Sequence, residues 1–207
     1  MGQKSAFTQG GAFASNAGAA DTKTANSFRG HFLIAMPSLR DPMFSHTITF
    51  VCDHNANGAL GIVINHPLEL KLGDVFAQLE LPTEGRLAKQ TVLAGGPVQI
   101  DRGFVLHPAG QQWESTLQIS EDVSLTASRD IIVDMANDRG PDKALVALGY
   151  AGWEAGQLEE EIASNSWLTV PAQKHILFDT PVEQRWAAAS QYLGIDLNLI
   201  HSTAGHA

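Results

Sequence analysis

The sequence predicts a single mixed α/β domain, and three observations support this fold class. Short runs with strand character recur throughout residues 28–207, and segments with apolar residues at helical spacing alternate with them. No internal repeat and no linker-like stretch interrupts these residues. A chain of 207 residues with 44% hydrophobic content is also long enough to bury a sizeable core.

The first part of the domain predicts a strand followed by a β-hairpin. Residues 46–52 alternate as in a half-buried strand: His46, Ile48, Phe50 and Cys52 share one face, and Thr47, Thr49 and Val51 share the other. Asn and Gly tolerate positive φ and so supply the turn that follows. The predicted elements are the strand Phe32–Met36, stopped by Pro37, the loop Ser38–Phe44, the strand His46–Cys52, the turn Asp53–Gly58 and the strand Ala59–Asn65.

The middle of the chain predicts two helices with β segments between them. Leu72, Val75, Phe76 and Leu79 recur at helical spacing before Pro82, and Ser128 can cap a helix that extends through Asp138. The Gly95–Val98 segment lacks both nucleotide-binding glycine patterns and predicts a tight turn. The β segments predicted here are Thr91–Ala94, Arg102–His107, Ser115–Ser120 and Val123–Thr126.

The last third predicts a doubly buried strand, two further strands and two helices. Ala144–Tyr150 is almost continuously apolar, which is typical of a central strand. A helix around Trp153–Asn165 would carry Trp153, Leu158 and Ile162 on one side and the acidic run Glu159–Glu161 on a solvated face. The remaining predictions are strands at Trp167–Val170 and Ile176–Phe178, and a helix at Pro181–Tyr192 that Gly194 ends.

Composition argues against several classes of partner and site. The net charge is −9 and no cluster of Lys and Arg is visible along the chain, so nonspecific nucleic-acid binding is disfavoured. No apolar run approaches the roughly 18 residues of a membrane helix. A single Cys suits a reducing compartment. We therefore expect a cytoplasmic protein without cofactors, in which residues 1–27 form a disordered tail and residues 28–207 form the domain.

Cys52 and His54 pose the first question about chemistry. They could form a thiol–imidazole pair only if the turn folds back, since residues i and i+2 of a strand share a face. The alternative is a buried structural cysteine, which its apolar strand neighbours Ile48 and Phe50 favour. A metal site made from His46, Cys52 and His54 is the least favoured interpretation, because none of the eight His residues shows local ligand spacing.

A set of polar residues at turns and strand ends suggests a binding site. An Arg guanidinium there could grip a carboxylate or phosphate if these elements converge. The alternative is ordinary loop capping and salt bridging. The set comprises Arg40, Asp41, His54, Asn65, Arg102 and His107.

Four separated blocks of the sequence resemble the YqgE/AlgH family of bacterial proteins. They are GHFLIAMPSLRDPMFSHTITFVCDHNANGALGIVINHP (Gly30–Pro67), GGPVQIDRGFVLH (Gly95–His107), ALGYAGWEAGQLEEEIASNSWL (Ala147–Leu168) and ILFDTPVEQRWAAASQYLGID (Ile176–Asp196).

The resemblance implies an α/β domain with a bifurcated, barrel-like sheet surrounded by helices. The family's Cys-acid-His block corresponds to Cys52, Asp53 and His54, and its Arg-Gly pair to Arg102 and Gly103. The long segment before residue 28 departs from the family. One branch is labelled a transcriptional regulator, although no basic recognition helix is visible in this sequence.

The leading hypothesis is a non-enzymatic regulatory protein that binds a small anionic ligand or a protein partner, because no catalytic motif such as G-x-S-x-G is present. The alternative is a thiol-dependent enzyme or redox sensor that uses Cys52 and His54. A third possibility is a structural protein that forms oligomers through an apolar patch.

Overall fold

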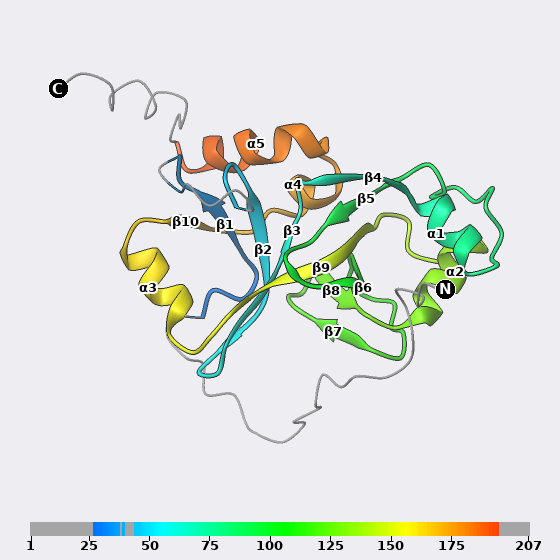
Figure 1. The fold of residues 1–207 in the computed structure, drawn as a ribbon, viewed down its shortest axis with the longest axis horizontal. Coiled ribbons are helices and arrows are strands. Elements are labelled where there is room, and N and C mark those ends of the chain that lie inside the picture. Colours follow the sequence, from blue (N-terminus) through cyan, green and yellow to red (C-terminus); the bar gives the residue numbers. More distant parts are fainter. Residues whose placement is uncertain (1–26, 38, 40–43, 195–207) are drawn as a thin grey trace.

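A strongly curled sheet of ten strands organises the part of the chain that the computed structural model describes, residues 27–37, 39 and 44–194 (Figure 1). The main path runs β10-β1-β2-β3-β9-β6-β8-β7, and β4 joins through β5. The α/β fold class is therefore confirmed. The strands are β1 (His31–Ala35), β2 (Ile48–Asn55), β3 (Gly58–Val63), β4 (Pro67–Lys71), β5 (Thr91–Ala94), β6 (Val98–Pro108), β7 (Thr116–Gln118), β8 (Val123–Thr126), β9 (Leu145–Trp153) and β10 (Trp167–Pro171).

The sheet divides at β9. The first half of this strand, Leu145–Leu148, pairs antiparallel with β6, and Ala147 and Leu148 also pair in parallel with β5. The second half, Ala151–Trp153, pairs antiparallel with β3. Leu145 and Ala147 pack in one hydrophobic cluster and Val146 packs in another, so both faces of the first half of β9 are buried, which explains its almost continuously apolar sequence.

Helices cover both sides of this sheet and one end of it. Figure 1 shows α1 and α2 together on one side, α3 on the opposite side, and α5 near α4 at the end. The helices are α1 (Leu72–Gln78), α2 (Arg129–Ala136), α3 (Gln157–Ala163), α4 (Lys174–Phe178) and α5 (Arg185–Tyr192), with a 3-10 turn at Val182–Gln184 before α5.

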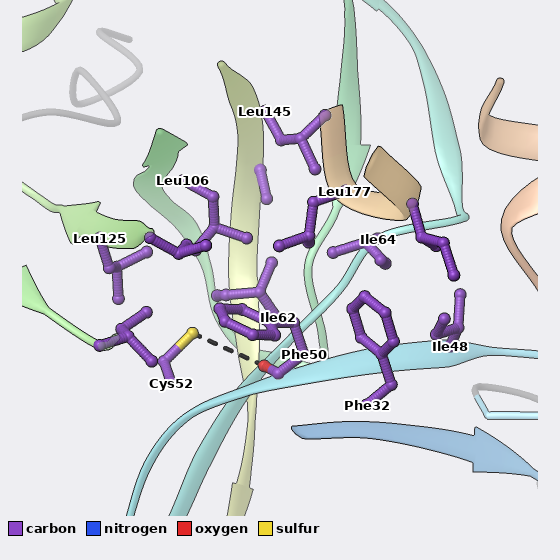
Figure 2. Close-up of a cluster of buried hydrophobic side chains, with 14 of the residues drawn as sticks. Phe32, Ile48, Phe50, Cys52, Ile62, Ile64, Leu106, Leu125, Leu145 and Leu177 are labelled. Carbon is purple, nitrogen blue, oxygen red and sulfur yellow. Dashed lines mark hydrogen bonds between the residues drawn. The ribbon is translucent and has the colours of Figure 1, made fainter. Parts of the chain in front are cut away.

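The strand β2 is buried on both faces. Ile48, Phe50 and Cys52 point into the central core shown in Figure 2. On the other face, Val51 packs in a second cluster with Leu158 of α3, and Thr49 is also inaccessible. Successive side chains of β2 thus point to opposite faces, as predicted. The prediction of a half-buried strand is wrong, however, because α3 covers the face that would otherwise meet solvent.

The predicted strand Ile176–Phe178 is wrong, since these residues end the one-turn helix α4. The amide of Ile176 donates to Gln173 O at 3.0 Å, and the amide of Asp179 donates to His175 O at 2.9 Å. Figure 2 shows Leu177 in the same cluster as Ile64 and Leu145. A run of three apolar residues fits a buried helical turn as well as a buried strand, so periodicity could not separate them.

Two predictions around α3 also need correction. Trp153 ends β9 instead of lying in the helix, although it still packs with Leu158 and Ile162. The acidic run is not simply a solvated face. The Glu161 carboxylate accepts hydrogen bonds from the indoles of Trp153, at 2.9 Å, and Trp167, at 2.8 Å. It therefore joins β9 to β10 beneath the helix.

The predicted tail at residues 1–27 lies outside the described residues except for Ser27. Arg40 and Asp41, two members of the predicted polar set, also lie outside them.

Candidate functional site

The Cys52 thiol lies in the central core. Its side chain is 0% exposed, and Sγ donates a weak hydrogen bond to Phe50 O at 3.6 Å (Figure 2). Burial, and secondarily the carboxylate of Asp53, raises the pKa of this thiol far above the ordinary value. A thiol in this state presents little thiolate to a substrate or oxidant.

The His54 imidazole does not pair with Cys52. Nδ1 accepts a hydrogen bond from the amide of Phe28 at 3.0 Å, and Nε2 lies 3.0 Å from Glu159 Oε1. Because Nδ1 accepts, the neutral ring carries its proton on Nε2 and donates it to Glu159. Both ring nitrogens therefore fasten the start of the domain and α3 to the end of β2. The structure does not form the predicted thiol–imidazole pair.

Asn65 and Arg102 occupy separate surroundings. Asn65 Oδ1 accepts from the amide of Ile48 at 2.9 Å, and Nδ2 donates to His46 O at 2.8 Å, so this side chain aligns the ends of the hairpin strands. Arg102 lies over the Phe104 ring, 5.3 Å from its centroid, and donates to Gln99 Oε1 at 3.2 Å.

His107 belongs to a directed chain of hydrogen bonds inside the sheet. Its Nδ1 lies 2.9 Å from Pro108 O, which can only accept, so Nε2 is the acceptor for the Thr126 hydroxyl at 2.9 Å. Thr126 Oγ1 lies 2.7 Å from Thr116 Oγ1, which in turn accepts from the amide of Trp113 at 2.8 Å. Burial of this histidine lowers its pKa below the usual value, which favours the neutral ring.

We expect this histidine to make the protein less stable in mild acid. The unfolded chain takes up a proton on His107 near pH ~6.5, whereas the folded protein resists it until a lower pH. Stability is therefore complete above about pH 6.5 and falls as the pH drops through this value. Urea unfolding between about pH 7.5 and pH 5 should show a shallower pH dependence for His107→Gln than for the unsubstituted protein.

His66 provides the control for this measurement. Burial also lowers its pKa, but the side chain is only partly buried. We expect His66→Gln to change the pH dependence less than His107→Gln does. Equal slopes for the unsubstituted protein and His107→Gln would contradict this assignment.

The four described members of the predicted polar set therefore do not share one set of contacts. His54, Asn65, Arg102 and His107 each bond to different groups, and three of them connect strands or helices to their neighbours. Convergence with Arg40 and Asp41 stays a prediction, because these two residues lie outside the described part. Within that part, no group of three His, Cys, Asp or Glu side chains is placed to hold a metal ion.

An open pocket lies elsewhere, at the junction of β4, α1 and the loop that follows α1. Its volume is about 610 Å³, and much of this space is open to solvent. We call it the lysine pocket. It is lined by Lys71, Gly73, Asp74, Ala77, Thr83, Ala88 and Lys89.

Backbone hydrogen bonds hold the two walls of the lysine pocket together. The amide of Leu72 donates to Gln90 O, and the amide of Gly73 donates to Ala88 O, both at 2.8 Å. A Cβ on Gly73 would lie 3.1 Å from Ala88 O, so the absence of a side chain permits this close approach. The start of α1 and the segment before β5 are thereby fixed side by side.

Lys71 and Asp74 are oriented by their neighbours. The Asp74 carboxylate accepts the amide of Lys71 at 2.8 Å, which stabilises the first turn of α1. The Lys71 ammonium donates to Thr91 Oγ1 at 2.6 Å, which leaves two of its three N–H groups for a ligand. The Asp74 carboxylate and the Lys71 ammonium thus each have one hydrogen-bond partner, and both residues line the pocket.

Lys71 and Lys89 differ from most other cations of the described chain. Neither forms an ion pair with a described residue. An Asp carboxylate lies within 4.0 Å of each of Arg29, Arg86, Arg139, Lys143 and Lys174. The lysine pocket therefore brings two lysines and one carboxylate, that of Asp74, together on a protein whose net charge is −9.

Sequence reasoning missed the lysine pocket. Lys71 and Lys89 are 18 positions apart, so a search for runs of basic residues along the chain cannot find them. They meet because β4 pairs antiparallel with β5 at Lys71 and Thr91. The sequence pattern did not predict that the chain returns after α1 and that β5 then pairs with β4.

No helix in the described ranges has both the length and the apolar character needed to cross a bilayer.

Comparisons with known proteins place the fold and sequence in a family. A family model described as AlgH-like matches residues 32–198. A UPF0301 protein of Saccharophagus degradans is 61% identical over 181 residues, which cover 87% of this chain and 89% of that protein. A UPF0301 protein of Thioalkalivibrio sulfidiphilus is 53% identical over 182 residues, covering 88% and 98% of the two chains.

Solved structures agree with this placement. The solution structure of the AlgH protein from Pseudomonas aeruginosa aligns with a TM-score of 0.74 at 47% identity, covering 91% of this chain and 100% of that one. A crystal structure from Corynebacterium diphtheriae aligns with a TM-score of 0.66 at 16% identity, covering 82% and 89%, which shows a shared fold alone. The chain belongs to the AlgH-like family of UPF0301 proteins.

Proposed function

We propose that this protein is a non-enzymatic regulatory protein that binds a small organic anion in the lysine pocket. The observation that carries the proposal is the pair Lys71 and Lys89, which line one pocket without an ion-pair partner among the described residues. Ammonium groups form charge-assisted hydrogen bonds with carboxylates and phosphates, and these are stronger than bonds between neutral groups.

A binding role is favoured over catalysis for two reasons. The reactive group considered from the sequence, Cys52, is buried with a raised pKa, and both nitrogens of His54 are already bonded. The titratable groups that line the lysine pocket are Lys71, Asp74 and Lys89, and Asp74 is engaged in a helix-terminal hydrogen bond. These groups can bind a charged ligand, but no base among them is aligned with a nucleophile, as general base or nucleophilic catalysis requires.

The test is calorimetric titration with acetate, inorganic phosphate and benzoate at low ionic strength. We expect the double variant Lys71→Ala/Lys89→Ala to bind the preferred anion at least about tenfold more weakly, since each charge-assisted bond contributes roughly 1.5–3 kcal/mol. Added salt should weaken binding to the unsubstituted protein, because the site is open and its charges are screened.

Lys143→Ala/Lys174→Ala is the matched control. It removes the same number of positive charges from the protein, but at exposed lysines that pair with Asp179 and Asp122. Its affinity for the anion should stay close to that of the unsubstituted protein. Equal weakening by both double variants, or no binding of any of the three anions, would overturn the proposed function.

A further inference from the structure

The segment that leads into β1, residues 27–30, is attached to the end of β2 through His54. We call it the lead segment. The amide of Phe28 donates to Nδ1 of the buried imidazole at 3.0 Å, and the Ser27 hydroxyl donates to His54 O at 3.1 Å. The Phe28 ring also packs on the imidazole, with the two centroids 5.3 Å apart. His54 therefore contacts both of the first two residues of the lead segment.

The rest of the lead segment is held by contacts that do not involve an imidazole. The amide of Gly30 donates to the backbone of β2 at 2.9 Å, and the Phe28 carbonyl accepts from the amide of His31 at 3.0 Å. The Arg29 guanidinium donates to two carbonyls at the end of β7. Loss of the imidazole contact therefore frees the chain only up to the Phe28 amide, and the turn that follows stays in place.

Protonation has opposite effects at the two ring nitrogens of His54. Nε2 already donates to Glu159 Oε1 at 3.0 Å, and a positive charge on the ring makes this a charge-assisted hydrogen bond. Nδ1 accepts in the neutral ring, but both nitrogens of an imidazolium are donors. Nδ1–H would then face the amide N–H of Phe28, so that bond is lost. A proton on His54 thus strengthens its contact with α3 and breaks its contact with the lead segment.

Four charged or titratable groups surround this contact. Asp53 precedes the histidine on β2 and lies 3.7 Å from the guanidinium of Arg29, which neutralises part of its charge. His31 on β1 meets the Phe28 ring edge to face, with the centroids 6.2 Å apart. Glu159 on α3 is the one of these four that bonds to the imidazole, so its carboxylate stabilises a positive charge on the ring.

We propose that His54 is a pH-sensitive anchor, which holds the Phe28 amide when the ring is neutral and releases it on protonation while α3 stays bound. Histidine is the side chain whose charge ordinarily changes between pH 5 and pH 8. The anchor therefore holds above this range and releases as the pH falls through it. One hydroxyl bond from Ser27 then remains, and a lone bond at the end of a segment is readily exchanged for water. The point at which the preceding chain leaves the domain thus moves from Ser27 to the turn at Arg29.

An NMR titration from pH 8 to pH 5 tests the anchor. The Phe28 amide should shift and gain picosecond–nanosecond mobility in its heteronuclear NOE, with the same midpoint as the ring protons of His54. The Gly30 amide should stay rigid throughout. A Phe28 amide that stays rigid while His54 takes up a proton would overturn the proposal, and so would a His54 ring that stays neutral down to pH 5.

His54→Gln tests whether this histidine is the titrating group. The variant has no imidazole at position 54, so its Phe28 amide should show one state from pH 8 to pH 5. A Phe28 transition that persists in this variant would belong to another group, such as His31, and the anchor would be assigned wrongly.

Glu159→Gln tests the opposing contact with α3. Gln keeps an acceptor oxygen for Nε2 but removes the carboxylate charge, so the midpoint of the Phe28 transition should move to lower pH. Glu160→Gln is the matched control, because it removes the same charge from the next position of α3, which is exposed. Equal midpoints for the two variants would contradict the role of Glu159.

Discussion

Gly96→Ala is expected to destabilise the protein by about 4 kcal/mol or more, which places it among exceptional single substitutions. Gly96 has a φ of 151°, and an added Cβ would lie 2.1 Å from the carbonyl carbon of Tyr150 and 2.3 Å from the amide nitrogen of Ala151. Both atoms belong to the backbone of β9, where the sheet divides. Relief of the overlap would require the two chain segments to separate, because no flexible side chain can move aside.

Gly110→Ala is the control for backbone strain. Gly110 has a φ of 126°, but an added Cβ there would meet nothing within 4 Å. Its cost should stay at roughly 1–2 kcal/mol, the usual penalty of a left-handed conformation for an L-residue. Urea unfolding, or the yield of folded protein, compares the two variants. Similar stabilities for Gly96→Ala and Gly110→Ala would contradict the close contact between Gly96 and β9.

Arg185→Ala is expected to cost roughly 3–5 kcal/mol, because two hydrogen bonds from a buried charged group are lost, at about 1.5–3 kcal/mol each. Arg185 is 4% exposed and begins α5. Its guanidinium donates to Ile64 O at 2.5 Å and to Thr180 O at 3.1 Å, so it fastens α5 to the end of the hairpin. Burial lowers its pKa to about 10, which leaves it charged at neutral pH.

Two variants test whether the planar guanidinium of Arg185, which donates to two carbonyls, is needed for stability. Arg185→Lys keeps the charge but cannot reach both carbonyls in the same planar geometry, so we expect it to recover only part of the lost stability. Arg129→Ala removes an exposed arginine whose bond to Leu79 O is 3.4 Å long, and it should cost less than about 1 kcal/mol. Arg185→Ala with the stability of Arg129→Ala would contradict this account of α5 docking.

The parts of the fold that depend on local pattern could be predicted from sequence. The alternation from Ile48 to Cys52 and the Asn-Gly turn indicated the β2–β3 hairpin, and Gly194 with a φ of 69° follows α5 as expected. The inward position of Cys52 followed from the same alternation and is confirmed by its complete burial. In each case neighbours along the chain carry the information.

Features that depend on contacts between distant segments could not be predicted. The alternation of β2 gave no sign that α3 would cover its second face, and the acidic character of Glu161 gave no sign that two indoles would meet it. The sequence predicts His107 as a member of the polar binding set at turns and strand ends, but a chain of threonine hydroxyls satisfies it inside the sheet. The lysine pocket depends on the pairing of β4 with β5, which brings together residues 18 positions apart.

The most direct test of anion binding in the lysine pocket is amide chemical-shift mapping by NMR during a titration with benzoate. The largest shifts should fall on the amides of the pocket lining, including Gly73, Ala77 and Ala88, and should saturate together with a single affinity. The Lys71→Ala/Lys89→Ala protein should lose these shifts while the rest of its spectrum is retained. Saturable shifts confined to another surface, or the same shifts in the double variant, would contradict the assignment of this pocket as the binding site.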